Sequence, residues 1–431
     1  MLDRADAIVI ERDAHLPGLR TLLDTEAFCA TLQRLCPDRD IRAATARYVR
    51  YKPQTSCLVA YEVAVGRESI GVYARCHAED QLVKVTNARL RMEVRSTLGP
   101  GLLTDPHAGI AVFAYPNDYE IKSLRKLFEG DRTPPRLRRM LPAHPHLHAT
   151  TPTPLRYKPE RRFVGKFASE EGPAAVLRLY PEPMFAGVRE KAWAFKDSGQ
   201  LQVPRVIGDS ARYSALAHEW IEGQPLVEIL TAPANAAPVL GRVASALTEL
   251  HRQRPRLSSM YSASDYCRSL ESACAAVGVL DDTLGQRARE LLEAVQPLVL
   301  ERPWRSQAVH GDFTADQVLV QNDRVAVLDY DRAAYGDPVM DVGAFAAGLI
   351  SLSLHGQLPM SRAVAMAGEF AAAYWQAAGF EDVAGARTLT AGSLLMMAPE
   401  PFRHRHPEWP RAIAALLESA DRVLVQEAID A

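Results

Sequence analysis

The stretch from Ala308 to Phe345 decides how this chain is expected to fold, and its sequence is AVHGDFTADQVLVQNDRVAVLDYDRAAYGDPVMDVGAF. Two short apolar runs, Val318–Val320 and Val325–Leu328, flank Gln321–Arg324, whose composition is typical of a turn. We therefore expect a β-hairpin. A hairpin brings the residues before its first strand close to those after its second strand.

Three side chains with oxygen donors gather at the open end of this predicted hairpin. Asp312 and Gln317 precede the first strand and Asp329 follows the second, so strand pairing sets Gln317 near Asp329 and Asp312 one loop away. Carboxylate and amide oxygens suit Mg²⁺, which favours one or two carboxylates together with substrate phosphates. The five-residue step from Asp312 to Gln317, followed later by Asp329, is similar to the spacing of the protein-kinase catalytic loop.

Taken together, these motifs resemble the aminoglycoside phosphotransferase and choline kinase superfamily. The matching residues are His310-Gly311-Asp312, Leu328–Asp331 and Gly336–Pro338 with Asp341. The resemblance covers about Leu155 to the C-terminus and implies an α+β, protein-kinase-like two-lobed fold. The implied parts are an N-terminal α+β cap with a linker at residues 1–150, a small antiparallel β lobe for ATP at 151–222, and a large, mostly helical lobe for catalysis and acceptor binding at 223–431.

The resemblance also implies a role for each matching residue. Asp312 would orient the acceptor hydroxyl and accept its proton, and Asp329 and Gln317 would bind Mg²⁺. Gln317 stands where most members of the family have Asn. Maltokinase-like sugar kinases also have Gln at this position, and they also carry an N-terminal cap. The residues that would support the site are His310, Asp331, Asp337 and Asp341.

Upstream segments match the nucleotide-binding elements of the same superfamily. Arg178, in the predicted strand Val176–Tyr180, occupies the place of the usual phosphate-contacting Lys, and Glu190 would be its helix partner. Arg can pair with Glu and still reach phosphate, although its geometry differs from that of Lys. Lys166 and Lys158 compete with Arg178 for the phosphate contact. The segment 215–223 resembles the hinge of the fold, where adenine would bond to the backbone near Glu219 and Ile221.

An acceptor site is predicted in Ala398–Pro410, which combines an aromatic platform with charged side chains. The candidate residues are Glu400, Arg403, Arg405 and Trp409. The alternative is a proline-punctuated loop that packs onto the last helix. A polycationic aminoglycoside needs an acidic pocket, and this segment is not acidic, which favours a neutral or anionic acceptor.

The composition of the chain argues against several classes of protein. The 431 residues carry 50 Lys and Arg against 52 Asp and Glu, a net charge of −2 that argues against a nucleic-acid binder. The longest apolar run, Val342–Leu354, is shorter than the roughly 20 residues of a membrane span and predicts a buried helix instead. Six cysteines without a Cys-x-x-Cys pair, and no secretory signal, favour a cytoplasmic protein.

One short motif occurs twice. Arg50–Pro53 and Arg156–Pro159 both have the sequence Arg-Tyr-Lys-Pro, and each is followed by an apolar run that predicts strand, turn, strand. Further strands are predicted at Ile70–Cys76 and Ala174–Tyr180. The repeated Arg-Tyr-Lys-Pro motif indicates either two hairpins with related packing or a duplicated small lobe. The third possibility is coincidence.

We therefore expect an ATP- and Mg²⁺-dependent phosphotransferase that acts on a hydroxyl of a small molecule, with a sugar or sugar derivative favoured. The first alternative is an aminoglycoside-type antibiotic kinase. The second is a nucleotide-binding pseudokinase without turnover, which the departures at Gln317 and Arg178 suggest. No nucleic-acid or membrane partner is expected, and the sequence leaves the acceptor and the oligomeric state open.

Overall fold

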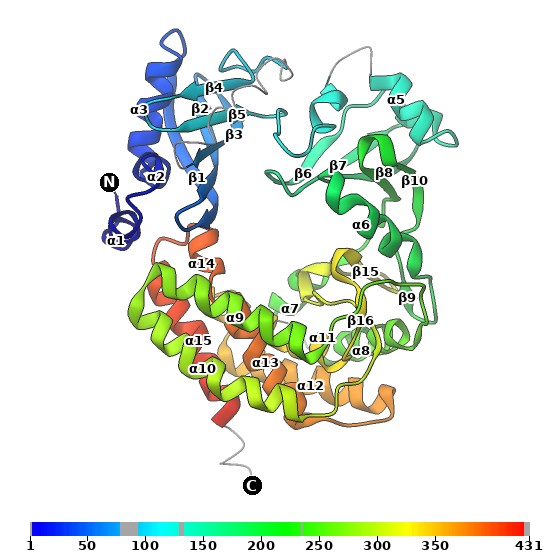
Figure 1. The fold of residues 1–431 in the computed structure, drawn as a ribbon. Helices are drawn as coiled ribbons and strands as arrows, with labels where there is room; N and C mark the ends of the chain where they lie inside the picture. The colour runs from blue at the N-terminus through cyan, green and yellow to red at the C-terminus, as the bar shows by residue number, and fades with distance from the viewer. Residues whose placement is uncertain (1, 78–93, 129–132, 234–235, 426–431) are drawn as a thin grey trace. The chain divides into compact units, whose positions relative to one another are not determined.

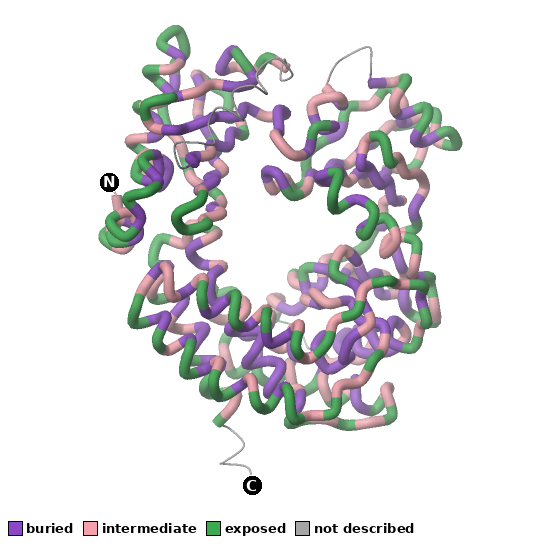
Figure 2. Tube along the Cα trace, in the orientation of Figure 1, coloured by how far each residue is buried: buried purple, intermediate pink, exposed green. Residues whose placement is uncertain are grey.

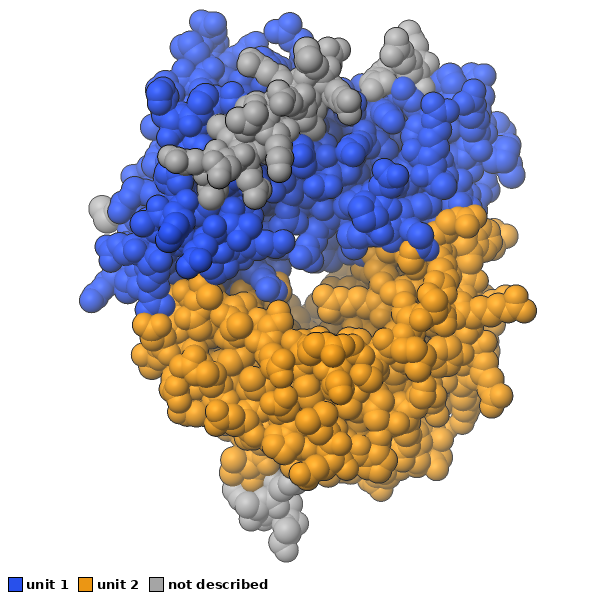
Figure 3. Space-filling view, viewed as in Figure 1, with its two compact units in different colours: residues 1–186, 206–220, 401–407 blue, residues 187–205, 221–400, 408–431 orange. Residues whose placement is uncertain are grey.

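The computed structural model describes residues 2–77, 94–128, 133–233 and 236–425. The chain forms two compact units, coloured separately in Figure 3. Unit 1 comprises residues 1–186, 206–220 and 401–407, and unit 2 comprises residues 187–205, 221–400 and 408–431.

Unit 1 begins with three helices and an antiparallel sheet of five strands (Figure 1). The helices are α1 (Arg4–Arg12), α2 (Leu19–Leu23) and α3 (Thr25–Leu35). The strands are β1 (Ile41–Lys52), β2 (Ser56–Val65), β3 (Glu68–His77), β4 (Leu102–Asp105) and β5 (Ile110–Ala114), in the spatial order β1-β2-β3-β5-β4. The Asp24 carboxylate accepts hydrogen bonds from two backbone N–H groups and so caps α3.

A second antiparallel sheet of five strands follows in unit 1. Its strands are β6 (Thr153–Lys158), β7 (Arg162–Ser169), β8 (Gly172–Leu179), β10 (Val206–Ser210) and β11 (Ala215–Glu219), in the spatial order β6-β7-β8-β11-β10. One face of β7 and β8, including Phe163, Phe167 and Leu177, packs against the helical segment Leu124–Phe128 and helix α5 (Thr133–Met140). The other face of this sheet is only half buried on β7 and β8.

Unit 2 is mostly helical, and Figure 2 marks the buried stretches of its long helices. After α6 (Glu182–Ala194), which begins in unit 1, the helices are α7 (Leu226–Thr231), α8 (Ala237–Arg252), α9 (Ala263–Leu280), α10 (Asp282–Glu301), α11 (Val339–Leu354), α12 (Met360–Ala378), α13 (Val383–Met397) and α15 (Trp409–Val425). The short helix α14 (Glu400–Arg403) belongs mostly to unit 1. Helix α9 starts with a reciprocal capping box between Ser262 and Asp265, and α12 ends at Gly379 in the left-handed region.

Two small sheets in unit 2 contain strands from the segment Ala308–Phe345. In one sheet, β14 (Val318–Val320) pairs with β15 (Val325–Val327), and β12 (Gln224–Pro225) and β9 (Leu201–Gln202) lie at its edges. In the other, β13 (Gln307–Val309) pairs with β16 (Ala334–Gly336). The predicted hairpin is therefore present, with Val318 opposite Val327.

The expected α+β fold, with a small antiparallel sheet followed by a mostly helical region, is confirmed. Val342–Leu354 lies within the buried helix α11, as predicted. None of the described helices is long and apolar enough to cross a bilayer. All six cysteines are free and buried. The three-part division at residues 150 and 222 stays a prediction.

The two copies of the Arg-Tyr-Lys-Pro motif end equivalent strands. Arg50–Lys52 closes β1 and Arg156–Lys158 closes β6, and each strand turns into the next antiparallel strand of its sheet. The further strands predicted after each hairpin are β3 and β8. Strand, turn, strand is thus confirmed at both places.

Candidate active site

The open end of the β14–β15 hairpin brings the backbone of Gln317 close to the segment that carries Asp329. The backbone N–H of Leu328 donates to the carbonyl of Gln317 at 2.8 Å, which extends the strand pairing by one step. Gln317 therefore lies beside the residue that precedes Asp329. Asp329 itself adopts the left-handed conformation, with φ 67° and ψ 62°, so the chain turns sharply at this carboxylate.

The loop that carries Asp312 is fixed by a buried carboxylate from helix α11. Asp341 is fully buried and accepts hydrogen bonds from the N–H groups of His310, at 2.7 Å, and Gly311, at 2.8 Å. The ring of His310 is buried and its Nε2 lies 2.7 Å from the Leu328 carbonyl. These contacts hold the loop against the end of β15.

Gly311 allows the loop to approach the segment after Asp329. Its φ is +76°, and a Cβ at this position would lie 2.6 Å from the Arg332 carbonyl oxygen. The next residue, Asp312, has a 46% exposed side chain, and its Oδ1 lies 3.6 Å from Nη1 of Arg332. Asp312 and the residues around Asp329 are therefore neighbours, and Asp312 presents its carboxylate to solvent.

A lysine on helix α6 joins the same cluster. Nζ of Lys191 donates to the backbone carbonyl of Asp331 at 3.0 Å. Burial lowers the pKa of Lys191, and the nearby Asp331 carboxylate acts in the opposite direction. The contact anchors the short turn that follows Asp329.

The oxygens at Gln317 and Asp329 fit a hard divalent cation. Nε2 of Gln317 donates to the Asp316 carboxylate at 3.1 Å, which leaves the amide oxygen as the remaining acceptor of that side chain. An amide oxygen and a carboxylate are the donor types that Mg²⁺ uses together with phosphate oxygens. Within the described residues, no group of three or more His, Cys, Asp and Glu side chains is arranged to hold a metal without such help.

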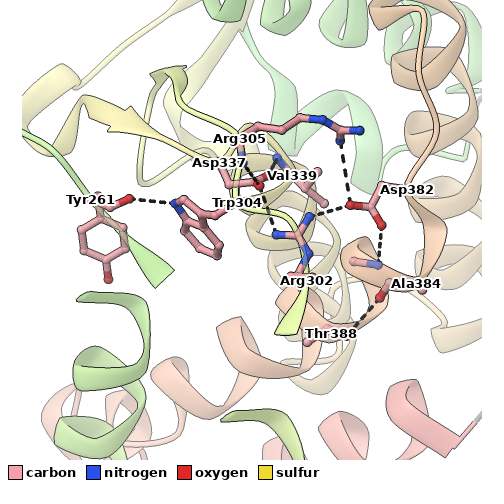
Figure 4. A network of polar contacts seen from close by, with 10 residues as sticks. Tyr261, Arg302, Trp304, Arg305, Asp337, Val339, Asp382, Ala384 and Thr388 are labelled. Atoms are coloured by element: carbon pink, nitrogen blue, oxygen red, sulfur yellow. Dashed lines mark hydrogen bonds and ion pairs between the residues drawn. The ribbon is translucent and has the colours of Figure 1, made fainter. Parts of the chain in front are cut away.

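Asp337 organises the chain between β16 and α11 (Figure 4). Its Oδ1 accepts from the N–H of Val339, and its Oδ2 accepts from the N–H of Arg305 at 2.9 Å and from Arg302 at 3.1 Å. Arg302 also pairs with Asp382, whose carboxylate caps α13. The buried Asp337 thus connects the start of α11 to the segment that precedes β13.

The nucleotide-contact candidates of unit 1 lie on the half-buried face of the second sheet. Arg178 on β8 is paired with Val164 on β7, and Lys166 lies two pairs further along β7, opposite Val176. The ammonium of Lys166 sits 3.7 Å from the ring centroid of Trp220, a close cation–π contact. Glu219 ends β11, opposite Ala175.

Two of the nucleotide-contact candidates, Glu190 and Ile221, lie in unit 2. Glu190 accepts hydrogen bonds from the hydroxyl and the backbone N–H of Ser258, and these bonds lower the pKa of its carboxyl. Ile221 is 7% exposed. The predicted pair of Arg178 and Glu190 joins residues of different units and stays a prediction.

The acceptor candidates are placed as follows. Glu400 and Arg403 bound helix α14. Arg405 forms a largely buried, two-pronged ion pair with Asp6 of helix α1, and Trp409 is 2% exposed at the start of α15. The geometry thus gives Arg405 a structural partner and gives Trp409 the packing role named as the alternative, and acceptor binding by this segment stays a prediction.

The loop that carries Asp312, the β14–β15 hairpin and Asp341 all lie within the part of the chain that one family model matches. The model is that of the phosphotransferase enzyme family, and it matches residues 126–389, which is more than half of the chain. The chain belongs to this family. At that coarse level it is a small-molecule phosphotransferase, as the motifs implied.

Three solved structures are similar to parts of this chain. A choline/ethanolamine kinase family protein from Mesorhizobium loti is 16% identical, with a TM-score of 0.47, over 67% of this chain and 94% of that one. The macrolide 2'-phosphotransferase MphH from Brachybacterium faecium is 19% identical, with a TM-score of 0.43, over 65% and 98%. A glucosamine kinase is 18% identical, with a TM-score of 0.41, over 62% and 80%. Similarity this low says nothing about the substrate, and no curated protein matches the chain.

The sequence did not predict three of the residues that contact this candidate site. His251 binds Asp341, Lys191 binds the turn after Asp329, and Arg332 lies beside Asp312. Arg332 could have been found, because it directly follows the motif Asp329–Asp331. His251 and Lys191 gave no such signal, because each comes from a distant helix.

Proposed function

We propose that this protein is an ATP- and Mg²⁺-dependent phosphotransferase that transfers the γ-phosphate to a hydroxyl of a sugar or sugar derivative. The observation that carries the proposal is the hydrogen bond from Leu328 N–H to the Gln317 backbone carbonyl, which brings the residue before Asp329 next to Gln317. The exposed carboxylate of Asp312 lies on the adjoining loop.

In the proposed reaction, Asp312 accepts a hydrogen bond from the acceptor hydroxyl and takes its proton as the oxygen attacks phosphorus. Asp341 holds the N–H groups of His310 and Gly311, so the loop need not reorganise when the acceptor binds. The loop would accelerate the reaction by positioning Asp312. Positioning lowers the activation free energy most when the reacting atoms are held near their attack geometry. Arg332 stands where it can steady the Asp312 carboxylate.

Mg²⁺ would be held by Asp329 and by the amide oxygen of Gln317, and it would neutralise charge on the phosphate oxygens. The bond from Gln317 to Asp316 supports this assignment, because it fixes which end of the amide remains to accept. Lys191 holds the turn after Asp329 by its main-chain carbonyl contact at Asp331. Arg178 would contact the phosphates from the second sheet of unit 1.

The preference for a sugar rests on two sequence features. Gln317 matches the catalytic-loop residue of maltokinase-like sugar kinases, and the segment 398–410 lacks the acidic excess that a polycationic antibiotic requires.

The first test is nucleotide binding by thermal shift. ADP and a non-hydrolysable ATP analogue should raise the melting temperature, and Mg²⁺ should increase that rise, because a ligand bound to the folded state stabilises it by mass action. In Asp329→Ala the Mg²⁺-dependent part should disappear. If neither nucleotide changes the melting temperature of the wild-type protein, the proposal is refuted.

Turnover then separates the alternatives. Labelled ATP is incubated with a panel of neutral sugars, amino sugars and aminoglycosides, and the labelled product is identified. Transfer to a sugar supports the proposal, and transfer to aminoglycosides alone would replace it with the antibiotic-kinase alternative. Nucleotide binding without transfer to any acceptor of the panel would favour the pseudokinase.

A further inference from the structure

The two five-stranded sheets of unit 1 are copies of one arrangement. Both have the same strand order, and their pairing registers correspond along one cross-strand row. In the first sheet, one cross-strand row runs Arg50, Leu58, Arg75, Ala111, Thr104. In the second, the corresponding row runs Arg156, Val164, Arg178, Leu216, Asp209. Arg50 therefore corresponds to Arg156, and Arg75 corresponds to Arg178.

The turns between the first two strands of each copy agree in detail. Gln54 and Glu160 both have positive φ, at 57° and 59°. The Asp13 carboxylate accepts from the Tyr51 hydroxyl at 2.7 Å and from the Gln54 N–H at 2.8 Å. In the second copy, the equivalent hydrogen bonds, with the same two lengths, run from the Tyr157 hydroxyl and the Glu160 N–H to the Asp118 carboxylate. Such agreement favours a duplicated lobe over coincidence.

In the first copy, the two arginines of the row bind an anion. Arg50 and Arg75 both donate to the carboxylate of Glu160, one to each oxygen, and the Glu160 side chain is 3% exposed. The arginines stand two strands apart, on the same face, because directly paired residues point to the same side of a sheet. Long side chains at this spacing can thus converge on a single anionic group.

The surroundings of the row differ between the copies. Beside the arginine row, the first copy carries the stacked rings of Tyr73 and Phe113, and the second copy has Val176 and His218 at the corresponding positions. The arginine row of the first copy is therefore occupied by its own aromatic pair and by Glu160, which comes from the turn of the second copy. The second copy has smaller side chains there and an exposed Arg156.

We propose that Arg156 joins Arg178 in binding a phosphate group of the nucleotide, in the way that Arg50 and Arg75 bind the Glu160 carboxylate. The inference rests on the proposed function, since it assigns a phosphate contact to a kinase. Guanidinium groups suit phosphate as they suit carboxylate, because their planar fork of N–H groups can donate charge-assisted hydrogen bonds to two oxygens of either anion.

The test compares ADP with adenosine by isothermal titration calorimetry, in the presence of Mg²⁺. Arg156→Ala should weaken ADP binding about tenfold, the effect of losing one hydrogen bond to a charged group, and should leave adenosine binding unchanged. Arg156→Gln is the second variant in case the first does not fold. The matched control is Arg161→Ala, which removes the same charge from the exposed turn of the same hairpin but lies off the row.

Three results of this calorimetry would each contradict the proposed role of Arg156. Unchanged ADP binding in Arg156→Ala, with a loss in Arg178→Ala, would overturn the role of Arg156 and leave the proposed function standing. Equal losses for ADP and adenosine would mean that Arg156 acts on the fold and not on phosphate. A wild-type protein that binds no ADP would remove the proposed function together with this inference.

Discussion

Nε2 of His251 donates to Oδ2 of Asp341 at 3.0 Å, with both side chains almost completely buried. The same carboxylate holds the N–H groups of His310 and Gly311, so helix α8 is connected through one acid to the loop that presents Asp312. On its other side, Nδ1 of His251 lies 2.7 Å from the Tyr374 hydroxyl of helix α12. The loop is therefore braced by two helices that lie far from it in sequence.

His251→Phe should destabilise the protein by about 1–3 kcal/mol, because the buried Asp341 carboxylate loses one of its hydrogen bonds and the buried Tyr374 hydroxyl loses its bond to His251. It should also lower kcat while the KM for nucleotide changes little, since the loop loses its support. Chemical denaturation and steady-state kinetics measure the two effects. Tyr374→Phe is the control, because it removes only the outer bond and should cost about 1 kcal/mol. Equal effects of the two variants on kcat would argue against a bracing role for His251.

Asp312→Asn should keep nucleotide binding and lower phosphotransfer about a hundredfold or more, because it removes the group that takes the acceptor proton. The substitution is nearly isosteric and the side chain is about half exposed, so folding should be unaffected. Turnover with labelled ATP measures the loss, and Asp323→Asn, in the exposed turn of the hairpin, is the control. Normal turnover in Asp312→Asn would remove Asp312 from the reaction.

Asp316→Ala should raise the Mg²⁺ concentration needed for half-maximal nucleotide binding about tenfold, because partners that orient a metal ligand typically contribute that much. Without the bond from Gln317 Nε2 to Asp316, the amide can rotate and present either end. Gln317→Ala should have a larger effect in the same titration. If Asp316→Ala changes nothing while Gln317→Ala does, the amide is oriented by other contacts.

Gly311→Ala should cost more than the strain of its backbone conformation alone. A residue with a Cβ at positive φ costs about 1–3 kcal/mol, and here the Cβ would also lie 2.6 Å from the Arg332 carbonyl. Gly356→Ala is a matched control, because Gly356 has φ +71° and nothing within 4 Å of the added Cβ. The difference between the two free energies of unfolding isolates the contact, and a difference near zero would mean that the segment after Asp329 yields easily.

The local parts of the site could be predicted from the sequence. Gln317, Leu328 and Asp329 are brought together by one short hairpin, whose turn composition and apolar runs are explicit in the chain. The strand–turn–strand pattern of the two Arg-Tyr-Lys-Pro motifs was equally local. What these motifs do not reveal is that an acid outside each hairpin, Asp13 or Asp118, clamps the turn.

The non-local parts could not be predicted, because no period or spacing connects distant elements. His251 is 90 residues from Asp341, and Lys191 is 140 residues from Asp331. Arg405 was interpreted as an acceptor contact, whereas its partner in the structure is Asp6, 399 residues away. A charged residue on a loop is equally consistent with a ligand contact and with a buried ion pair, and only the fold distinguishes them.

Glu160 makes stability depend on pH in a defined direction. Burial raises the pKa of its carboxyl above 4.5, although Arg75 and Arg50 act to lower it. A folded-state pKa above the unfolded value means that the folded form holds the proton more tightly, so this group's contribution is present at low pH and is lost as pH rises from about 4.5 through the folded pKa. The free energy of unfolding of the wild type minus that of Glu160→Gln should therefore fall over that range. Arg75→Gln removes the larger of the two lowering influences and should move the fall to higher pH. Denaturant titrations between about pH 4 and 8 measure both curves, and a difference that stays flat, or rises, would show that the two arginines outweigh burial.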